Sequence, residues 1–183
     1  MDKIKLPNRP LGPFPVVLVG ADVNNKPNYT TVGACGVVSL EPVLYVSLRR
    51  THYTTSGIKE TGYFSVNIPS ANLIRETDYC GIVTGRTTDK SKLFKSFYDD
   101  LGKAPMISEC PLNILCKVLE SKPIFDFEFF LGTILAVYLN KQCLTDGKPD
   151  SSKINPIILM DTNYFSLGQI IGAVYKEGKQ KAT

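Results

Sequence analysis

The chain has 183 residues, 43% of them hydrophobic and 21% charged, a composition typical of one globular domain with a sizeable core. Its net charge of +4 is small, and lysines alternate with acidic residues in stretches such as KEGKQK, so no nucleic-acid-binding surface is expected. Five cysteines without a C-x-x-C pair and a single histidine argue against a zinc site and predict reduced, mostly buried thiols.

The N-terminal stretch MDKIKLPNRPLGP lacks the apolar core of a signal peptide. The longest apolar run, FPVVLVGA, is too short to cross a bilayer. We therefore expect a cytoplasmic protein that makes no membrane contact and forms one domain over residues 1–183.

Strands dominate the predicted secondary structure. Apolar and β-branched runs predict strands over residues 14–21, 29–32, 36–40, 43–48, 63–68, 112–120, 127–139, 157–159 and 169–175. In residues 43–48, Leu44, Val46 and Leu48 occupy alternate positions, which is typical of a strand with two different faces.

Three short helices are predicted between these strands. One covers residues 55–61 and ends at Gly62, a second begins after Ser70 and runs through Tyr79, and a third begins after Asp89 and runs through Phe97. The stretch PDSSKINP, residues 149–156, is predicted as a polar loop. Closely spaced strands with few helices favour an antiparallel barrel, and no Gly-rich nucleotide-binding turn is present in the sequence.

The stretch SLRRTHYTTSGIKETG, residues 47–62, places positive charge and hydroxyls at a strand end. Strand alternation would give two faces, each with a cation and polar donors: Arg50, His52 and Thr54 on one, and Arg49, Thr51 and Tyr53 on the other. The start of the following helix would lie close by, and this combination suits a phosphate group. Alternatively, the arginines pair with carboxylates such as Glu60 or Asp78, and the residues alone leave both interpretations open.

Four motifs in register, together with a further stretch near the C-terminus, carry a resemblance to a known family. They are NYTTVGACGVVSLEP, VSLRRTHYT, IKETGYFSVNIPS, DYCGIVTGRTTDKSKLF and, near the C-terminus, NYFSLGQIIGAVYKEGK. In this order they resemble the flavin reductase-like, FMN-binding split-barrel family and its flavoredoxin-like branch. The resemblance implies a mainly β fold, a six-stranded antiparallel Greek-key barrel with peripheral helices. It also implies FMN as the cofactor, in a homodimer with the flavin at or near the subunit interface.

The resemblance further implies a set of FMN-binding residues. Those near the isoalloxazine ring are Asn28, Thr30, Thr31, Asn67 and the backbone of Ala34, Cys35, Gly36 and Val37. Those along the ribityl chain and phosphate are Ser39, Ser47, Leu48, Arg49, His52 and Thr54, with Lys90 as a further cationic contact from residues 84–90. Asn28 and Asn67 could instead be ordinary turn or strand-end residues, and Thr30 and Thr31 ordinary strand formers. Whether Arg49 or Arg50 meets the phosphate is left open.

The sequence departs from the family pattern in two places. Many relatives carry a tryptophan soon after the Asn-x-x-Thr motif, whereas this chain has Cys35 and Gly36 there and no tryptophan at all. Glu41 and Pro42 stand where relatives have paired prolines. These departures leave open what lies above the flavin ring and which second substrate is used.

The implied activity is hydride transfer from NADH or NADPH to FMN, followed by electron transfer to free flavin or to a redox partner protein. The flavin carries this chemistry, so no catalytic side chain is expected. Two alternatives are a flavoredoxin-type electron-transfer protein that does not use NAD(P)H, and a non-catalytic binder of another phosphorylated ligand.

Overall fold

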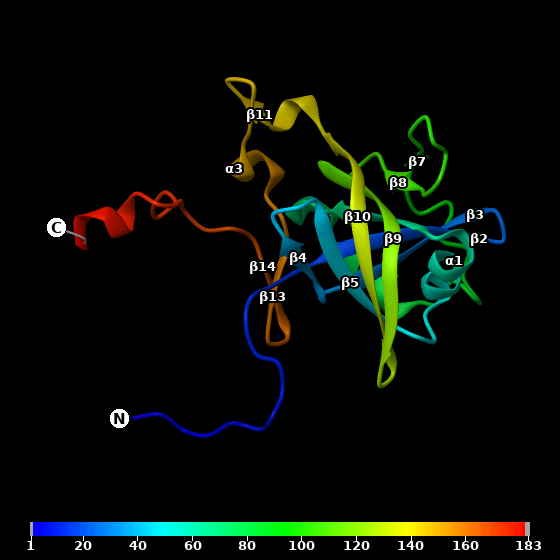
Figure 1. Ribbon diagram of the computed structural model, residues 1–183, viewed down its shortest axis with the longest axis horizontal. Helices are drawn as coiled ribbons and strands as arrows, with labels where there is room; N and C mark the ends of the chain where they lie inside the picture. The colour runs from blue at the N-terminus through cyan, green and yellow to red at the C-terminus, as the bar shows by residue number, and fades with distance from the viewer. Residues whose placement is uncertain (1, 182–183) are drawn as a thin grey trace.

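The computed structural model describes residues 2–181 (Figure 1). Its centre is a seven-stranded sheet in the order β3-β2-β6-β9-β10-β5-β4, and neighbouring strands are antiparallel. These strands are β2 (Val17–Val23), β3 (Lys26–Val32), β4 (Cys35–Ser39), β5 (Val43–Arg49), β6 (Tyr63–Ile68), β9 (Leu112–Ile124) and β10 (Phe127–Leu139).

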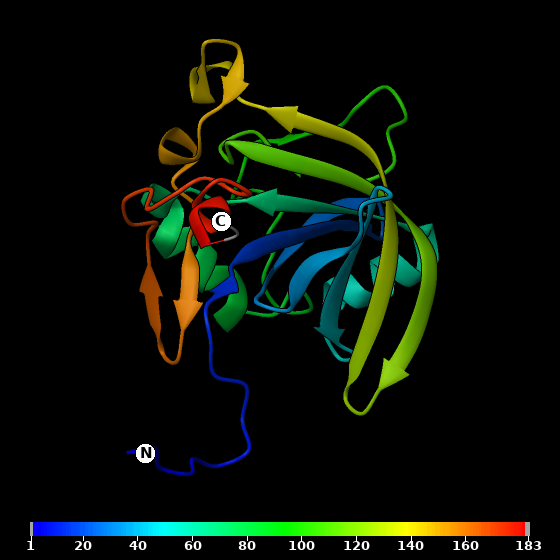
Figure 2. The ribbon, with the colours of Figure 1, turned by 60° about the vertical axis from the view of Figure 1, so that its left-hand side comes forward.

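The sheet curls into a barrel because its two outermost strands are consecutive in the chain (Figure 2). Gly33 and Ala34 alone join β3 to β4, and the Ala34 carbonyl accepts a hydrogen bond of 2.9 Å from the Ser47 N–H. The predicted antiparallel barrel is confirmed. The sheet has seven strands where the resemblance implied six, because it includes the short edge strand β4.

Shorter elements complete the fold. They are β1 (Phe14–Pro15), β7 (Ser96–Phe97), β8 (Met106–Ile107), β11 (Leu144–Thr145), β12 (Lys148–Pro149), β13 (Ile158–Met160), β14 (Asn163–Phe165), α3 (Ser151–Ile154), η1 (Ala71–Leu73), η2 (Lys141–Cys143) and η3 (Glu177–Lys181). Strands β1, β13 and β14 form a separate three-stranded sheet.

The core lies inside the barrel, as the alternation in β5 predicts. Leu44, Val46 and Leu48 are buried in the main apolar cluster together with Phe64 and Phe130. Each such side chain contributes about 1.5–3 kcal/mol by leaving water. The remaining β5 positions are half-buried or exposed, so this strand presents a second face outside the core.

Helix α1 (Tyr53–Thr61) packs chiefly against β2 and begins two residues earlier than predicted. It ends at Gly62, whose φ of 73° is the left-handed conformation that glycine adopts without strain. Gly57 lies so close to the backbone of Asp22 that no side chain would fit there. This close packing on β2 fixes the position of the helix start.

Helix α2 (Ile74–Ile82) confirms the second predicted helix, although the Ser70 side chain makes no capping hydrogen bond. The third predicted helix is wrong, because residues 91–94 form a turn and β7 follows. The Asp89 carboxylate accepts hydrogen bonds from the Ser91 N–H and hydroxyl, and the chain then pairs with β8. This strand pairing prevails over the helical spacing of the apolar residues.

Two predictions near the C-terminus are also wrong. Residues 149–156 contain α3, whose first turn is capped by the Asp150 carboxylate through the N–H groups of Ser152 and Lys153. Residues 169–175 form no strand, because no strand within residues 2–181 pairs with them. They belong instead to an extended segment that leaves the barrel (Figure 1).

Within residues 2–181, no helix has the length and apolar character needed to traverse a bilayer.

Candidate functional site

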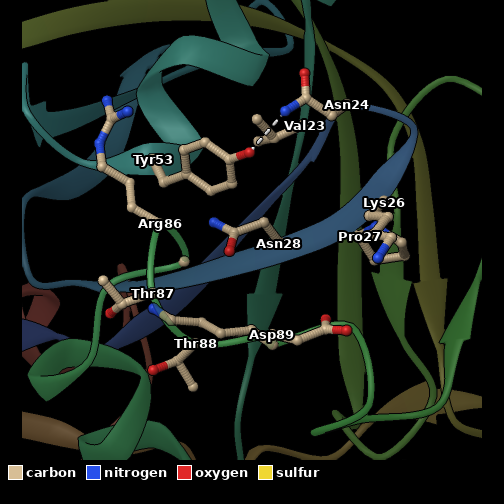
Figure 3. A pocket seen from close by; sticks show the side chains of 12 residues that line it. Val23, Asn24, Lys26, Pro27, Asn28, Tyr53, Arg86, Thr87, Thr88 and Asp89 are labelled. Atoms are coloured by element: carbon tan, nitrogen blue, oxygen red, sulfur yellow. Dashed lines mark hydrogen bonds between the residues drawn. The ribbon is translucent and has the colours of Figure 1, made fainter.

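A polar groove lies between β3, the start of α1 and residues 81–90, which comprise the end of α2 and the loop after it. It consists of two adjoining cavities of about 340 and 150 Å³. Both are lined by Asn28, Tyr53, Gly85 and Lys90. Thr30, His52 and Thr54 line the smaller cavity, and the larger one is shown in Figure 3. The groove thus brings together five residues from the predicted set: Asn28, Thr30, His52, Thr54 and Lys90.

The floor of the groove is a buried polar pair. The Asn28 side-chain amide donates a 2.7 Å hydrogen bond to the Thr54 hydroxyl, which joins β3 to the first turn of α1. Gly85 lies against the Asn28 side chain, so closely that a β-carbon at this position would collide with it. The absence of a side chain at Gly85 therefore allows the loop to approach the floor.

His52 is the N-cap residue of α1, where free N–H groups and the positive end of the helix dipole favour an anion. Its side chain makes no capping bond, and its buried Nδ1 atom has no hydrogen-bond partner among the described residues. Burial, together with the charges of Lys90 and Arg49, lowers the pKa of the His52 imidazole. An unpaired buried ring nitrogen is unfavourable unless a ligand or water meets it.

Lys90 supplies a buried cation on the opposite wall. Its ammonium donates hydrogen bonds to the Tyr29 carbonyl at 3.0 Å and the Cys80 carbonyl at 2.8 Å. An ammonium has three N–H donors, so one remains for a ligand. Burial lowers the pKa of this group, and no carboxylate within residues 2–181 forms an ion pair with it. A buried cation balanced only by carbonyl oxygens favours an anionic ligand.

The outer wall of the groove carries an aromatic ring and further polar groups (Figure 3). The Arg86 guanidinium lies 5.3 Å from the centre of the Tyr53 ring, and the Asn24 side-chain amide donates a 2.9 Å hydrogen bond to the Tyr53 hydroxyl. Thr87 and Thr88 line the larger cavity beside them. The groove can therefore accommodate a phosphate group with an adjoining polar chain.

The two arginines at the strand end lie outside this groove. Strand β5 ends at Arg49 and a turn follows, so the predicted alternation through RRTHYT does not hold beyond that residue. Arg49 lies over the Phe127 ring at 5.3 Å and lines a separate concavity with Arg50 and Lys59.

The alternative pairing of these arginines with carboxylates is also not observed. Neither Arg49 nor Arg50 forms an ion pair within the described part of the chain. Asp78 instead accepts a 2.8 Å hydrogen bond from the Tyr164 hydroxyl.

A second group of predicted residues lies along the β4–β5 edge. Its members are Ala34, Cys35, Gly36, Val37, Ser39 and Ser47. Ala34, Val37 and Ser39 are exposed, and burial raises the pKa of the Cys35 thiol to about 11. Since that thiol is protonated at neutral pH, this edge presents a neutral, partly apolar surface.

Leu48, Thr31 and Asn67, all from the predicted set, make their contacts inside the protein. The Leu48 side chain is in the core, so a ligand can meet only its backbone. The Thr31 hydroxyl donates to the Thr77 carbonyl.

Asn67 is fully buried and is not brought to the groove. Its amide nitrogen donates to the Leu18 carbonyl and the Ser65 hydroxyl, and its oxygen accepts from the Ile107 N–H and the Asn113 amide. These four bonds leave no polar capacity for a ligand.

Sequence reasoning did not name Gly85 or Arg86 individually, and it named Tyr53 only as part of a strand face shared with Arg49 and Thr51. Tyr53 and Arg86 lie inside the recognised motifs RRTHYT and TGRTTDK. The direction of their side chains depends on where β5 ends and on the path of the loop, which the motifs do not give. A glycine next to a charged loop residue was the available signal, because it permits close backbone approach.

The groove, with Lys90 on its wall and the start of α1 beside it, is chemically suited to a small anionic ligand. Residues 11–168 match the flavin reductase like domain family. A protein of Archaeoglobus fulgidus is 34% identical over 128 residues, covering 68% of this chain and 72% of that one. The chain therefore belongs to the flavin reductase-like family, which confirms the resemblance.

Two solved structures with more than 30% identity extend this finding. Flavoredoxin from Methanosarcina acetivorans superposes with a TM-score of 0.94 at 42% identity, covering 99% of this chain and 100% of that chain. Flavoredoxin of Desulfovibrio vulgaris (Miyazaki F) superposes with a TM-score of 0.90 at 32% identity, covering 96% and 99%. The split-barrel fold is thereby confirmed, and the family assignment supports FMN as the cofactor.

Proposed function

We propose that this chain is an FMN-dependent oxidoreductase whose groove holds the phosphate end of the cofactor. The observation that carries the proposal is that residues with three anion-binding features line one cavity. These are the free N–H of Lys90, the unpartnered Nδ1 of His52 and the start of α1. A phosphate dianion would accept from all three.

The positions of the remaining predicted residues indicate how the rest of the cofactor would be held. The ribityl chain would run past Ser47 toward the exposed β4–β5 edge. There the flavin ring would lie against the backbone of Ala34, Cys35 and Gly36. Gly36 lies close to the Tyr45 ring, and a β-carbon on it would come within 2.8 Å of that ring, so a side chain at this position would push the Tyr45 ring aside. Backbone donors and acceptors that no side chain covers are suited to an aromatic ring system.

The FMN isoalloxazine supplies the redox chemistry when bound, since it accepts and releases two electrons. The chain's own residues bind and orient the cofactor. Lys90 and His52 fix the phosphate, the Asn28–Thr54 pair holds α1 against β3, and the backbone of β4 meets the ring. None of these roles requires a side chain that donates or removes a proton in the reaction, so the proposal has no catalytic residue.

Electron delivery by a redox partner protein is the first of two modes for this oxidoreductase. It is favoured by the two flavoredoxin structures, which have 42% and 32% identity to this chain. Reduction by NADH or NADPH is the second mode, and the family match supports it. We further propose a homodimer, as the resemblance implies. The cytoplasmic location stays a prediction.

The decisive experiment is a visible absorption spectrum of the purified protein before and after addition of FMN, followed by anaerobic mixing with NADH or NADPH. Flavin bands that persist through gel filtration support the cofactor. Bleaching by a nicotinamide nucleotide supports the reductase mode, and bleaching only by a reduced partner protein supports the electron-transfer mode. A colourless protein that leaves FMN fluorescence unquenched would contradict the proposal and favour another phosphorylated ligand.

A further inference from the structure

The larger cavity of the groove lies outside the path proposed for FMN. Its volume of about 340 Å³ is within the range of small-molecule sites. His52, which the proposed function assigns to the FMN phosphate, lines only the smaller of the two cavities. The larger cavity is therefore a ligand-sized space with a lining of its own.

The position of this cavity follows from β3, which forms one wall of the groove. Lys26, Asn28 and Thr30 occupy alternate positions of the strand and so share one face. Lys26 lines the larger cavity, Asn28 lines both, and Thr30 lines the smaller one. Beyond Thr30 the chain leads to residues 34–36, the backbone proposed for the flavin ring. Lys26 lies four residues, or about 13 Å, from Thr30 in the direction away from the ring.

The opposite wall repeats this order. Residues 81–84 line the smaller cavity, residues 86–89 line the larger one, and Gly85 lines both. Since both walls give the same order, the larger cavity opens directly beyond the position proposed for the phosphate. A ligand there would extend away from the flavin ring, so this cavity is not the place of a nicotinamide that reduces the ring.

The lining of the larger cavity is mainly cationic. Lys26 and Arg86 are exposed at its rim, and neither forms an ion pair within residues 2–181. The carboxylate in the lining is that of Asp89, which accepts hydrogen bonds from the Ser91 N–H and hydroxyl. Two unpaired cations beside one engaged carboxylate favour an anionic group such as a phosphate.

The same cavity has an aromatic wall and hydroxyl groups (Figure 3). The Arg86 guanidinium lies 5.3 Å from the centre of the Tyr53 ring, and the Asn24 amide holds the Tyr53 hydroxyl at 2.9 Å. Thr87 and Thr88 add hydroxyls that can donate to a sugar or accept from it. Aromatic rings and guanidinium planes are surfaces on which nucleobases stack. The lining therefore combines groups suited to a phosphate, a sugar and a base.

We propose that the larger cavity binds a nucleoside phosphate at the phosphate end of FMN, with the phosphate between Lys26 and Arg86 and the base against Tyr53. Two ligands share this chemistry. One is the adenylate half of flavin adenine dinucleotide, which continues from the flavin phosphate, and the other is a free nucleotide such as ADP that binds beside FMN. The place of the site relative to the cofactor rests on the proposed function, whereas the cavity itself does not.

Two titrations of the full-length protein distinguish these sources. Calorimetry of the FMN-saturated protein with ADP is expected to show binding without release of FMN if the ligand is a free nucleotide. Fluorescence titration of the FMN-free protein is expected to show the dinucleotide binding at least about tenfold more tightly than FMN if the ligand is the adenylate, since it gains a charge-assisted hydrogen bond.

A pair of matched variants tests the residues. Arg86→Ala/Lys26→Met should lower the affinity for the nucleotide that binds by at least about tenfold and that for FMN by less than about fivefold. Arg75→Ala/Lys148→Met removes the same two charges from exposed positions that line neither cavity. This control should leave both affinities within about twofold of wild type.

Three results would overturn the proposal. The first is displacement of FMN by ADP, because both would then use the same cavity. The second is equal weakening of nucleotide binding in the two double variants, which would mean a general attraction of charge. The third is absence of ADP binding together with equal affinities for FMN and the dinucleotide. If the protein binds no FMN, the proposed function fails, and ADP titration of the wild type and the two double variants still decides the nucleotide site.

Discussion

Replacing Lys90 with methionine removes the buried cation of the groove and keeps a side chain of similar length. In the structure, Lys90 is 4% exposed and holds the Tyr29 and Cys80 carbonyls. Its remaining N–H is the donor assigned to the FMN phosphate. The change should therefore weaken FMN binding through the lost phosphate contact, and the loss of a donor to the two carbonyls should lower the free energy of unfolding.

The expected magnitude follows from the kind of bond that is lost. A hydrogen bond to a charged group contributes about 1.5–3 kcal/mol. This corresponds to a dissociation constant raised by about 10- to 150-fold. Riboflavin has no phosphate, so its affinity should change by less than about twofold. Lys26 lies exposed at the rim of the larger cavity, and Lys26→Met should weaken FMN by under about 1 kcal/mol because water screens its charge.

Fluorescence titration of wild type, Lys90→Met and Lys26→Met with FMN and with riboflavin measures these differences. Urea unfolding of each variant without ligand shows whether the fold is retained. Equal weakening of FMN and riboflavin in a folded Lys90→Met protein would refute the reasoning, since the loss would then come from the shape of the groove. Unchanged FMN affinity would refute it as well.

Three further outcomes are expected. His52 has a lowered pKa and is neutral at pH 7, and a bound phosphate should favour its protonated form. The FMN affinity of the wild type should therefore rise relative to that of His52→Gln as the pH falls from 7.5 to 5.5. Parallel curves of affinity against pH for the two proteins would contradict this. Arg49→Ala should change FMN affinity by under about 0.5 kcal/mol, because Arg49 lies over Phe127; a loss of about 1.5–3 kcal/mol in the same titration would return it to the phosphate. Asn67→Ala should lower the free energy of unfolding in urea by about 2–4 kcal/mol, because four buried groups lose their hydrogen-bond partner. The folded fraction should bind FMN normally. A stable variant with impaired FMN binding would instead make Asn67 a ligand-binding residue.

Much of the barrel could be predicted because the alternation of apolar residues in the sequence indicates which face of a strand is buried. The alternation of Leu44, Val46 and Leu48 is local information, and the structure places all three in the core. The helix expected after Asp89 failed for a long-range reason. Phe94 has a helical spacing, yet it packs edge-on against Tyr29 at 5.7 Å, and β7 pairs with β8. Spacing alone cannot distinguish these outcomes.

The candidate site was predictable as a set of residues but not as a geometry. His52 and Lys90 are far apart in the sequence, and only the fold puts them on one cavity. Arg49 and Asn67 were included through the resemblance, but both lie outside the groove. Arg49 lies at the end of β5, and Asn67 lies in a buried amide network. A family motif indicates which residues are present, whereas side-chain direction depends on where each strand stops.

The strand predicted over residues 169–175 shows a related limit. The pattern is that of a strand, and within residues 2–181 the chain offers it no partner. Strand propensity is realised only where another strand supplies hydrogen bonds. The strand prediction for these residues is therefore wrong.

A crystal structure of the protein with FMN tests the central claim most directly. The account predicts phosphate oxygens within hydrogen-bond distance of the Lys90 ammonium, the His52 Nδ1 atom and the first-turn N–H groups of α1. Phosphate bound instead in the concavity of Arg49 and Arg50, with water beside Lys90, would contradict it.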